Sequence, residues 1–374
     1  MLSFWEKQSF INYDCIVIGS GIVGLSTACS LKERYPDKSV LVLEKGILPT
    51  GASTKNAGFA CYGSAAEIWN DVQLIGWEKA LEVVELRVRG LRKLRSRLGD
   101  TAIDYEENGG GEIILNDDQF DLNPLDEINE NLKTIFNKSV FIPDPKKPET
   151  LGFQTQNIRT YITNTVEGQI DTGKMMRSLI TYCQKLGITI LTGFHVEHLD
   201  KPETYWQISG RDKEPSFKSP NLYVCTNAFT SDLLPNLDVR PGRGQVLITN
   251  PIKDIRFKGI YHFDQGYYYF RNVGNRILFG GGRNMDFEEE TTTKFELNPT
   301  IQNQLEWYLK ELILPVGTSY SIDHRWTGIM AFGKEKTPIV KDCGDGMKIG
   351  CRMNGMGVAI GTEIGEQLAY MPLK

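Results

Sequence analysis

The sequence has no long hydrophobic run, no cysteine pair at metal-binding spacing and no excess of positive charge. No segment approaches the roughly 20 apolar residues that a membrane-spanning helix requires. The first apolar run, Cys15 to Ile18, ends in glycines and is far too short for the core of a secretory signal. We therefore expect no membrane span and a cytoplasmic location.

The charge balance argues against nucleic-acid binding. Lys and Arg number 42 and Asp and Glu number 47, so the formal net charge is -5. A protein of this charge has no basic face with which to neutralise a phosphate backbone. Hydrophobic residues make up 40% and charged residues 24% of the chain, which is typical of a globular enzyme. The 374 residues can bury one large core or two smaller ones.

The seven cysteines and four histidines predict no metal site. The cysteines are odd in number, widely spaced and without a CxxC pair, which indicates reduced and mostly buried thiols. His195 and His198 lie three positions apart in a strand-like stretch, where this spacing places them on opposite faces.

The first strong signal is a strand, a glycine turn, a helix and a second strand. In chain order these are an apolar run at Cys15–Ile18, the glycines Gly19, Gly21 and Gly24 in the pattern GxGxxG, a helical pattern over 25–34 and a second strand over 40–44. An acidic residue about 20 positions after the last glycine completes the pattern. The unit is typical of a dinucleotide-binding fold.

Each residue of the glycine turn has a task in binding a dinucleotide. Gly19 permits the tight turn, Gly21 lets the backbone approach a pyrophosphate, and Gly24 lets the helix pack closely on the strand. The free N–H groups of the helix start, at Ile22 and Val23, then face the phosphates.

Glu44, with Lys45 beside it, is expected at the ribose. Its carboxylate can accept hydrogen bonds from both ribose hydroxyls and would repel a 2′-phosphate. The expected ligand therefore contains adenosine with an unmodified ribose. This unit by itself does not separate FAD from NAD.

The segment 51–58 favours a flavin because it is small, polar and flexible, and can wrap a pyrophosphate and lie against a flat ring. Its candidate cofactor contacts are Ser53, Thr54, Lys55, Asn56, Ala57 and Gly58. The stretch resembles the G-A-S-x-x-N-A-G loop beside the flavin in the superfamily of D-amino-acid oxidase, glycine oxidase and sarcosine oxidase. The resemblance implies an FAD-dependent amine oxidoreductase.

The resemblance covers nearly the whole chain. Further matching segments are 168–171, 194–196, 222–228, 243–246, 267–281 and 326–340. It implies that Val196, in a strand, meets the adenine through its backbone. It also implies that Thr226, Asn227 and Ala228 lie near the nucleotide.

A second glycine-bordered helix start lies near the C-terminus. A strand-like run at 347–351 leads into a helix that continues to Leu368, through Asn354, Gly355, Met356, Gly357 and Val358. In the family, a G-x-G of this kind lies against the flavin pyrimidine. A helix N-terminus there would stabilise the negative charge of reduced flavin.

We expect an α/β protein with an FAD-binding Rossmann-like domain of the glutathione-reductase type and a second, α+β substrate domain built on an antiparallel sheet. The FAD domain is discontinuous, over 1–100, 150–230 and 335–374, and the substrate domain comprises 101–149 and 231–334. Short strands at 244–249, 266–271 and 276–280 predict the antiparallel sheet. Residues 68–98 predict one or two amphipathic helices with a buried stripe of Leu74, Trp77, Leu81, Val84, Val88 and Leu91.

Three positions depart from well-known members of the family. Met330 falls where D-amino-acid and glycine oxidases place the arginine that binds the substrate carboxylate, and methionine cannot form that bidentate pair. Either another arginine replaces it, with Arg271, Arg283 and Arg325 as candidates, or the substrate lacks a carboxylate there. Gly328 falls at the cysteine that attaches flavin in monomeric sarcosine oxidases, so FAD should be non-covalent. Leu278 falls at the oxygen-activating lysine of that branch, which weakens an oxidase interpretation.

The run 267–271, with three tyrosines, is the best candidate for the substrate pocket. On a strand, Tyr267 and Tyr269 share one face while Tyr268 and Phe270 share the other. We expect one of these two faces to point toward the flavin, and we favour Tyr268 as the tyrosine that does so. The alternative is that all three tyrosines pack in an aromatic core.

The function that the sequence favours is FAD-dependent oxidation of a C–N bond in a small amine or amino acid. Hydride passes to flavin N5, and water hydrolyses the imine. One alternative is a flavin-binding subunit or electron carrier without amine turnover of its own. A second, an NAD-dependent dehydrogenase, leaves the 51–58 loop and the Asn354 turn unexplained.

Overall fold

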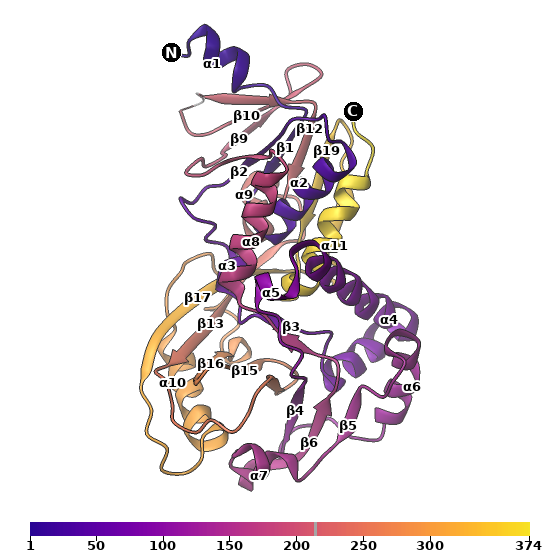
Figure 1. The fold of residues 1–374 in the computed structure, drawn as a ribbon, viewed down its shortest axis with the longest axis vertical. Coiled ribbons are helices and arrows are strands. Elements are labelled where there is room, and N and C mark those ends of the chain that lie inside the picture. The colour runs from indigo at the N-terminus through magenta and orange to yellow at the C-terminus, as the bar shows by residue number, and fades with distance from the viewer. Residues whose placement is uncertain (213–214) are drawn as a thin grey trace.

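Two large sheets lie toward opposite ends of the molecule. The structure is a computed structural model that describes residues 1–212 and 215–374. A six-stranded sheet occupies the end at which both termini lie, and an eight-stranded sheet occupies the other end (Figure 1). Helix α11 (Gly357–Tyr370) runs from the middle of the molecule toward the terminal end.

The six-stranded sheet contains the predicted dinucleotide-binding unit. All neighbouring strands are parallel except the edge strand β18. In spatial order the strands are β18 (Ile339–Asp342), β19 (Met347–Cys351), β12 (Asn221–Val224), β1 (Cys15–Ile18), β2 (Val40–Leu43) and β8 (Thr189–Leu191). Strands β1 and β2 are buried along their whole length, as a sheet covered on both faces requires.

Both faces of this sheet are covered. Val17 and Val42 pack against helices, while Ile16 and Leu41 pack against a small antiparallel sheet on the opposite face. The helices are α2 (Ile22–Arg34), α4 (Ala65–Leu98), α8 (Thr172–Lys185) and α11, and the small sheet comprises β9 (His198–Asp200), β10 (Trp206–Ser209) and β11 (Ser216–Ser219). The strand and helix predictions for the glycine-turn unit are confirmed.

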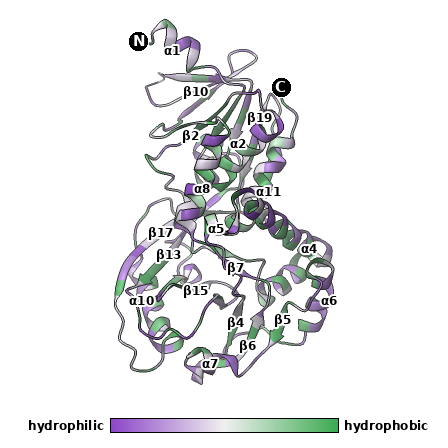
Figure 2. Cartoon of the chain, in the orientation of Figure 1, coloured by the Kyte–Doolittle hydropathy of each residue, from purple (hydrophilic) through white to green (hydrophobic). Residues whose placement is uncertain are grey.

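Helix α4 corrects one part of the predicted amphipathic stripe. Val84, Val88 and Leu91 are buried as expected, but Leu74 is 66% exposed. The cause is Gly76, whose φ of 79° interrupts the helix and shifts the phase of the buried stripe. Hydrophilic and hydrophobic residues alternate along the helix (Figure 2).

The eight-stranded sheet is antiparallel except where β14 meets β4. In spatial order its strands are β17 (Ile322–Phe332), β13 (Arg240–Thr249), β16 (Arg276–Gly281), β15 (Tyr268–Val273), β14 (Ile260–Phe263), β4 (Gly110–Leu115), β6 (Ile158–Asn164) and β5 (Phe141–Pro143). The three predicted antiparallel strands are confirmed as β13, β15 and β16. Strand β6 pairs in this sheet although it falls within the range 150–230 that was assigned to the FAD domain. The domain ranges themselves stay a prediction.

The two faces of the eight-stranded sheet differ. One face carries an aromatic core that includes Phe263, Tyr268 and Phe270, covered by α10 (Pro299–Tyr308) and η4 (Leu309–Ile313). The other face carries a small apolar cluster around Ala57 and Val246. We call this second face the junction face, because the loop that follows β2 packs on it.

The remaining elements are short or lie around these two sheets. They are α1 (Phe4–Ser9), α3 (Ala52–Lys55), β3 (Phe59–Ala60), α5 (Asp100–Ile103), α6 (Leu125–Phe136), α7 (Lys147–Leu151), η1 (Thr155–Asn157), β7 (Gly168–Gln169), η2 (Asn227–Phe229), α9 (Thr230–Leu233) and η3 (Arg283–Met285). Strands β3 and β7 pair with each other. All seven cysteines are free thiols and six are buried, as predicted.

Helices α2 and α11 lie side by side and run in the same direction. A Cβ at Gly361 would lie 2.7 Å from Ile22 Cγ2, and a Cβ at Gly365 would lie 2.6 Å from Ser26 Cβ. Because the paired positions increase together, the helices are parallel. Helix α11 begins four residues before Gly361, so its start projects about one turn, roughly 6 Å, beyond the start of α2.

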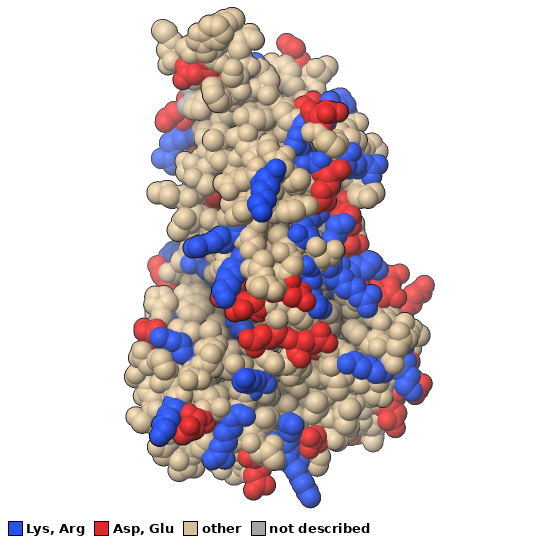
Figure 3. All heavy atoms as spheres, viewed as in Figure 1, with Lys and Arg blue, Asp and Glu red and all other residues tan. Residues whose placement is uncertain are grey.

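The surface and the helices carry two further observations. In the described parts of the chain, no helix combines the length and the apolar composition that crossing a bilayer demands. Acidic and basic side chains are interspersed over the face in view (Figure 3). That the chain does not bind nucleic acid stays a prediction.

We predict that Gly90→Ala destabilises the protein by about 1–3 kcal/mol or more, because a methyl group there overlaps the carbonyl oxygen of Ala359 in α11. Gly173→Ala in α8 is the matched control. Its Cβ meets only Asp171 Oδ1 at 3.3 Å, so the higher helix propensity of alanine should leave stability unchanged or raise it by up to about 1 kcal/mol. Urea unfolding of both variants measures the difference. Equal stability of the two variants would contradict the close α4–α11 packing.

Candidate active site

The start of α2 is built to receive an anion. Gly24 has no room for a side chain, because a Cβ would overlap the carbonyl oxygen of Gly19. The helix has no side-chain cap at Gly21 and no acidic residue in its first turn. The Ile22 N–H donates to Ser53 Oγ at 3.0 Å, and the positive end of the helix dipole faces the loop.

Glu44 is fixed at the carboxyl end of β2. Its Oε2 accepts hydrogen bonds from the N–H and hydroxyl of Ser20 at 3.0 and 2.7 Å, and its Oε1 accepts one from the Gly46 N–H at 2.9 Å. Each carboxylate oxygen has two lone pairs, so Oε1 keeps one free for a further donor. Lys45 Nζ lies 6.0 Å from the ring centroid of Phe229, at the end of η2, which links this position to the turn after β12.

The predicted flavin loop crosses from the six-stranded sheet to the junction face. Asn56 Oδ1 accepts from the Gly58 N–H at 2.8 Å and from Thr172 Oγ1 at 2.9 Å, which ties the loop to the start of α8. Trp326 Nε1 donates to the Lys55 carbonyl at 3.0 Å, which ties it to β17. The short helix α3 within the loop is held by Thr54 Oγ1, which donates to the Pro49 carbonyl at 2.7 Å.

The start of α11 is a strained turn held by two asparagines. Asn354 and Gly355 both have positive φ, 48° and 84°. Asn227 Oδ1 accepts from the Arg352 N–H at 3.2 Å, and the Asn354 side chain donates to the Lys336 carbonyl at 2.6 Å. Helix α11, like α2, has neither a side-chain cap nor an acidic residue in its first turn.

The start of α11 meets the junction face at Met330. Its Sδ lies 3.7 Å from where a Cβ at Gly355 would stand, and its Cε lies 3.0 Å from the corresponding position at Gly244. A Cβ at Gly328 would lie 3.1 Å from Lys55 Cβ. Glycines therefore line the strands where the loop and the α11 turn approach the sheet.

This donor set fits an FAD-like dinucleotide. Two helix starts without a side-chain cap at their N-cap residues supply N–H groups, offset by about one turn along the helix axes, and Glu44 supplies an acceptor for hydroxyl groups. Thr226, Asn227 and Ala228 complete this edge, because the carbonyl of the preceding Cys225 lies 2.6 Å from where a Cβ at Gly19 would stand. The individual cofactor contacts, including Gly357 and Val358 at the start of α11, stay predictions.

The structure corrects the preference for Tyr268. Its side chain is 3% exposed, lies parallel to the ring of Phe263 with centroids 4.9 Å apart, and contacts Tyr308 of α10. It therefore belongs to the aromatic core on the face turned away from the loop. The physical reason is that α10 covers the face of β15 to which Tyr268 and Phe270 point.

Tyr269, which points the opposite way, lies on the junction face. Its ring is 5.7 Å from that of Phe59, and it packs with Ala57 and Trp326. Its hydroxyl lies 3.8 Å from where a Cβ at Gly244 would stand, and burial raises its pKa to about 12. The alternation pattern identified the face that Tyr269 shares with Tyr267, but not which face meets the loop.

Arg271 contacts the loop 51–58 near Gly58. Its Nη2 donates to the Ile170 carbonyl at 2.9 Å and lies 2.9 Å from where a Cβ at Gly58 would stand. The guanidinium is 7% exposed, and burial lowers its pKa to about 10. Tyr267 lies apart from it, just before β15, with its ring 6.0 Å from that of Phe287.

The stretch around Val196 is not the strand that the resemblance implied. Residues 192–197 are irregular, and strand β9 begins only at His198. Val196 is 5% exposed and packs in the core beside the six-stranded sheet, while His195 Nδ1 lies 3.3 Å from Glu197 Oε1. A turn here follows from Gly193, whose φ is 76°.

A buried polar cluster adjoins the junction face, and the sequence analysis missed most of it. His262 pairs with Tyr269 on one side and with Glu112 on the other across three neighbouring strands. His262 Nε2 lies 3.8 Å from Glu167 Oε2, and its ring is 5.1 Å from that of Phe59. The sequence signal that could have pointed to this cluster is Glu112, an acidic residue inside the otherwise apolar strand β4.

Burial governs the protonation of this cluster. It raises the pKa of Glu112 to about 7, an effect only partly offset by hydrogen bonds from the Ala66 N–H and Ser64 Oγ. Burial opposes the charged form of His262, but the nearby carboxylates of Glu167 and Glu112 raise its pKa overall. No group of three or more potential metal ligands occurs in the described residues.

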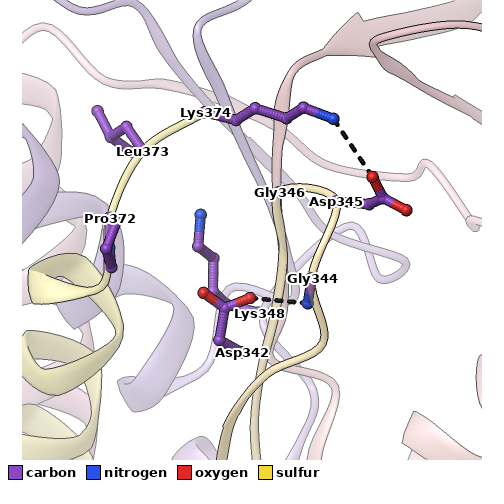
Figure 4. A pocket seen from close by; sticks show the side chains of 8 residues that line it. All are labelled: Asp342, Gly344, Asp345, Gly346, Lys348, Pro372, Leu373 and Lys374. Carbon is purple, nitrogen blue, oxygen red and sulfur yellow. Dashed lines mark hydrogen bonds and ion pairs between the residues drawn. The ribbon is translucent and has the colours of Figure 1, made fainter.

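An open hollow of about 290 Å³ lies at the opposite end of the parallel strands. Its lining comprises Asp342, Gly344, Asp345, Gly346, Lys348, Pro372, Leu373 and Lys374 (Figure 4). Lys374 pairs with Asp345 at 3.3 Å. Dinucleotides bind at the carboxyl ends of parallel strands, whereas this hollow lies where β19 begins. It is therefore separate from the candidate active site.

Comparisons with known proteins identify the family and the fold. A family model described as FAD dependent oxidoreductase matches residues 14–371. No protein with a curated description matches the chain. Among solved structures, L-proline dehydrogenase from P. horikoshii has a TM-score of 0.78 and 16% identity, over 96% of this chain and 92% of that one.

Two further solved structures share the fold. Glycine oxidase from Geobacillus kaustophilus has a TM-score of 0.77 and 15% identity, over 96% of this chain and 94% of that one. L-amino acid deaminase from Proteus vulgaris has a TM-score of 0.75 and 16% identity, over 96% and 93%. The predicted fold class is thereby confirmed.

We predict that Glu112→Gln flattens the dependence of stability on pH. In the folded protein Glu112 holds its proton up to about pH 7, whereas its ordinary pKa is 4.5. The folded state therefore binds more protons between these values, and the free energy of unfolding falls as pH rises through this window, by up to about 3 kcal/mol. Urea unfolding of the wild type and the variant from pH 4.5 to 8 measures the loss of this slope.

The exposed Glu82, replaced by Gln, is the control for this measurement and should leave the slope unchanged. Because the Glu112 carboxylate also raises the pKa of His262, the difference between the wild type and Glu112→Gln reports Glu112 together with its effect on His262. Parallel stability curves for these two proteins would show that Glu112 ionises normally and is not desolvated.

Proposed function

We propose, on the premise that this chain belongs to the family of FAD-dependent oxidoreductases, that it oxidises the C–N bond of a small amine or amino acid. The family model spans residues 14–371, and the chain is an FAD-dependent oxidoreductase. The observation that carries the proposal is that the loop 51–58 contacts the start of α2 through Ser53 and the junction face through Lys55, while the start of α11 meets the same face at Met330.

Four parts of the chain would hold FAD. The start of α2 at Gly21 and Ile22 would face the diphosphate, and Glu44 would accept from the ribose. The loop 53–58 and the start of α11 would lie against the ring. When bound, FAD supplies the hydride acceptor, N5, and the resulting imine is hydrolysed by water.

The chain itself positions the substrate and excludes water. Met330, Tyr269 and Trp326 present largely apolar surface on the junction face, which favours the neutral amine that hydride transfer requires. The positive end of α11 stabilises negative charge on the ring. Gly328 offers no side chain for covalent attachment, which supports non-covalent FAD.

The named activities of structural neighbours support a C–N substrate. A proline dehydrogenase, a glycine oxidase and an amino acid deaminase share this fold, and each name refers to an amino acid. The alternative, a flavin-binding subunit or electron carrier without turnover, rests on Met330 in place of an arginine.

We predict that the purified protein binds FAD non-covalently and that an amine or amino acid bleaches the flavin under anaerobic conditions. The screen comprises simple amines, D- and L-amino acids and N-methylated amino acids. Bleaching should need no added NAD, since FAD is the hydride acceptor. Release of FAD on acid precipitation tests the non-covalent attachment. Tight FAD binding with no bleaching by any compound would favour the electron-carrier alternative.

A second prediction concerns the charge at the start of α11. Gly357→Asp places an acid at the first helical position and should lower the flavin midpoint potential, because it opposes negative charge on the ring. We expect a shift on the order of 20–40 mV, since 30 mV corresponds to about 1.4 kcal/mol for two electrons. Gly357→Asn, which matches the size without the charge, should shift the potential much less. Equal potentials in both variants would place the ring away from α11.

A further inference from the structure

We propose that Arg283 binds the carboxylate of an amino-acid substrate, from a strand position different from that of Met330. The inference rests on the proposed oxidation of a C–N bond and names the substrate class: amino acids in preference to the amines that lack the carboxylate. Arg271 and Arg325, the other two sequence candidates, already have partners in the structure.

Arg283 contacts two aromatic rings at the edge of the junction face. Its Cζ is 4.0 Å from the ring centroid of Phe332, in β17, and 4.8 Å from that of Phe287. Cation–π contacts of this kind hold the guanidinium in place without using its N–H groups, which stay free to form a bidentate pair with a carboxylate. The preceding Gly281 and Gly282 have φ of 125° and 76°, which carry the chain from β16 to this position.

The side chain reaches the same face as Met330. Its Nη1 lies 3.5 Å from where a Cβ at Gly242 would stand, and Gly242 is the cross-strand partner of Met330. A side chain at Gly242 would overlap the ring of Phe332, so this glycine keeps the position open. Met330 in turn contacts the start of α11, which connects Arg283 to the proposed flavin ring position.

Arg283 has no acceptor of its own. Of the arginines in the described residues, it is the only one that is not fully exposed and yet forms no hydrogen bond or ion pair. Arg271 donates to the Ile170 carbonyl, and Arg325 donates to Gln302 Oε1 and Glu306 Oε1 at 2.6 Å each.

The nearby acid is already engaged. Glu290 is fully buried and accepts from Arg243 Nη2 at 2.7 Å and Nε at 3.0 Å. Burial lowers the pKa of Arg283, whereas Tyr267 and Glu290 raise it. The carboxylate of a bound substrate would therefore face the unpaired N–H groups of a partly desolvated guanidinium. A charge-assisted hydrogen bond is strong in such surroundings.

The rim of this region carries charges of both signs, because Glu288 and Glu289 are exposed and follow Phe287. Arg240 is exposed and is the cross-strand partner of Phe332, and Lys55 Nζ lies 5.2 Å from the ring centroid of Phe295. Among the described residues, neither Arg240 nor Lys55 forms an ion pair.

The test compares an amino acid with the amine that decarboxylation would leave. Suitable pairs are glycine with methylamine, alanine with ethylamine, proline with pyrrolidine and phenylalanine with phenethylamine, each chiral amino acid in both enantiomers. We expect Arg283→Met to raise KM for the amino acid about 100-fold or more while changing that for the amine by less than about 3-fold. Arg283→Lys should keep only part of the wild-type affinity for the amino acid, because the lysine ammonium is a point charge and cannot form the bidentate pair of a guanidinium.

Arg256→Met is the matched control, because Arg256 is exposed and makes no hydrogen bond or ion pair with described residues. It should leave both substrates unchanged. A second readout avoids turnover: acetate and benzoate are titrated into the FAD-bound protein, and the flavin absorption spectrum and Tm are followed. Both carboxylates should perturb the wild type and not Arg283→Met.

The outcomes separate this inference from the proposed function. If amines and amino acids are oxidised equally well, and the carboxylates bind the wild type and Arg283→Met alike, Arg283 has no such role while C–N oxidation stands. If nothing reduces the flavin but carboxylates bind through Arg283, the proposed function fails and the anion subsite stands. Should Arg283→Met fail to fold, Arg283→Lys decides by the same titration.

Discussion

The parallel packing of α11 against α2 determines where any dinucleotide can lie. Helices that run in the same direction present their positive ends at the same edge, and here the two ends are offset by about one turn. Gly361 and Gly365 make this approach possible, because larger side chains would collide with Ile22 and Ser26. Two segments at opposite ends of the sequence thereby bring two helix N-termini to one edge. An antiparallel arrangement would have placed a negative helix end against the diphosphate.

The nucleotide half of the site could be predicted because its signals are local. The strand, the glycine turn and Glu44 follow one another along the chain, and each has a stereochemical reason that needs no tertiary information. The same holds for the Asn354 turn, where an asparagine and a glycine both adopt positive φ.

The substrate half depends on tertiary packing that alternation along a strand does not contain. The pattern 267–271 separates two faces, but only α10 decides that Tyr268 enters the core and Tyr269 faces the loop. Similarly, Gly76 moves Leu74 out of the predicted stripe. His262 comes together with Glu167 through β-sheet pairing and a loop, so no sequence spacing could reveal the cluster.

Strand β13 shows how one short motif serves both faces of its sheet. Arg243 and Gln245 point to the core side, where both donate to the buried Glu290 and fix the segment after β16. Gly242 and Gly244 point to the junction face and leave room for Phe332, Arg283 and Met330. Because Phe287 lies only three residues before Glu290, the buried ion pair also sets the ring that stacks on Arg283. The interaction that stabilises one face thus determines the geometry available to the substrate on the other.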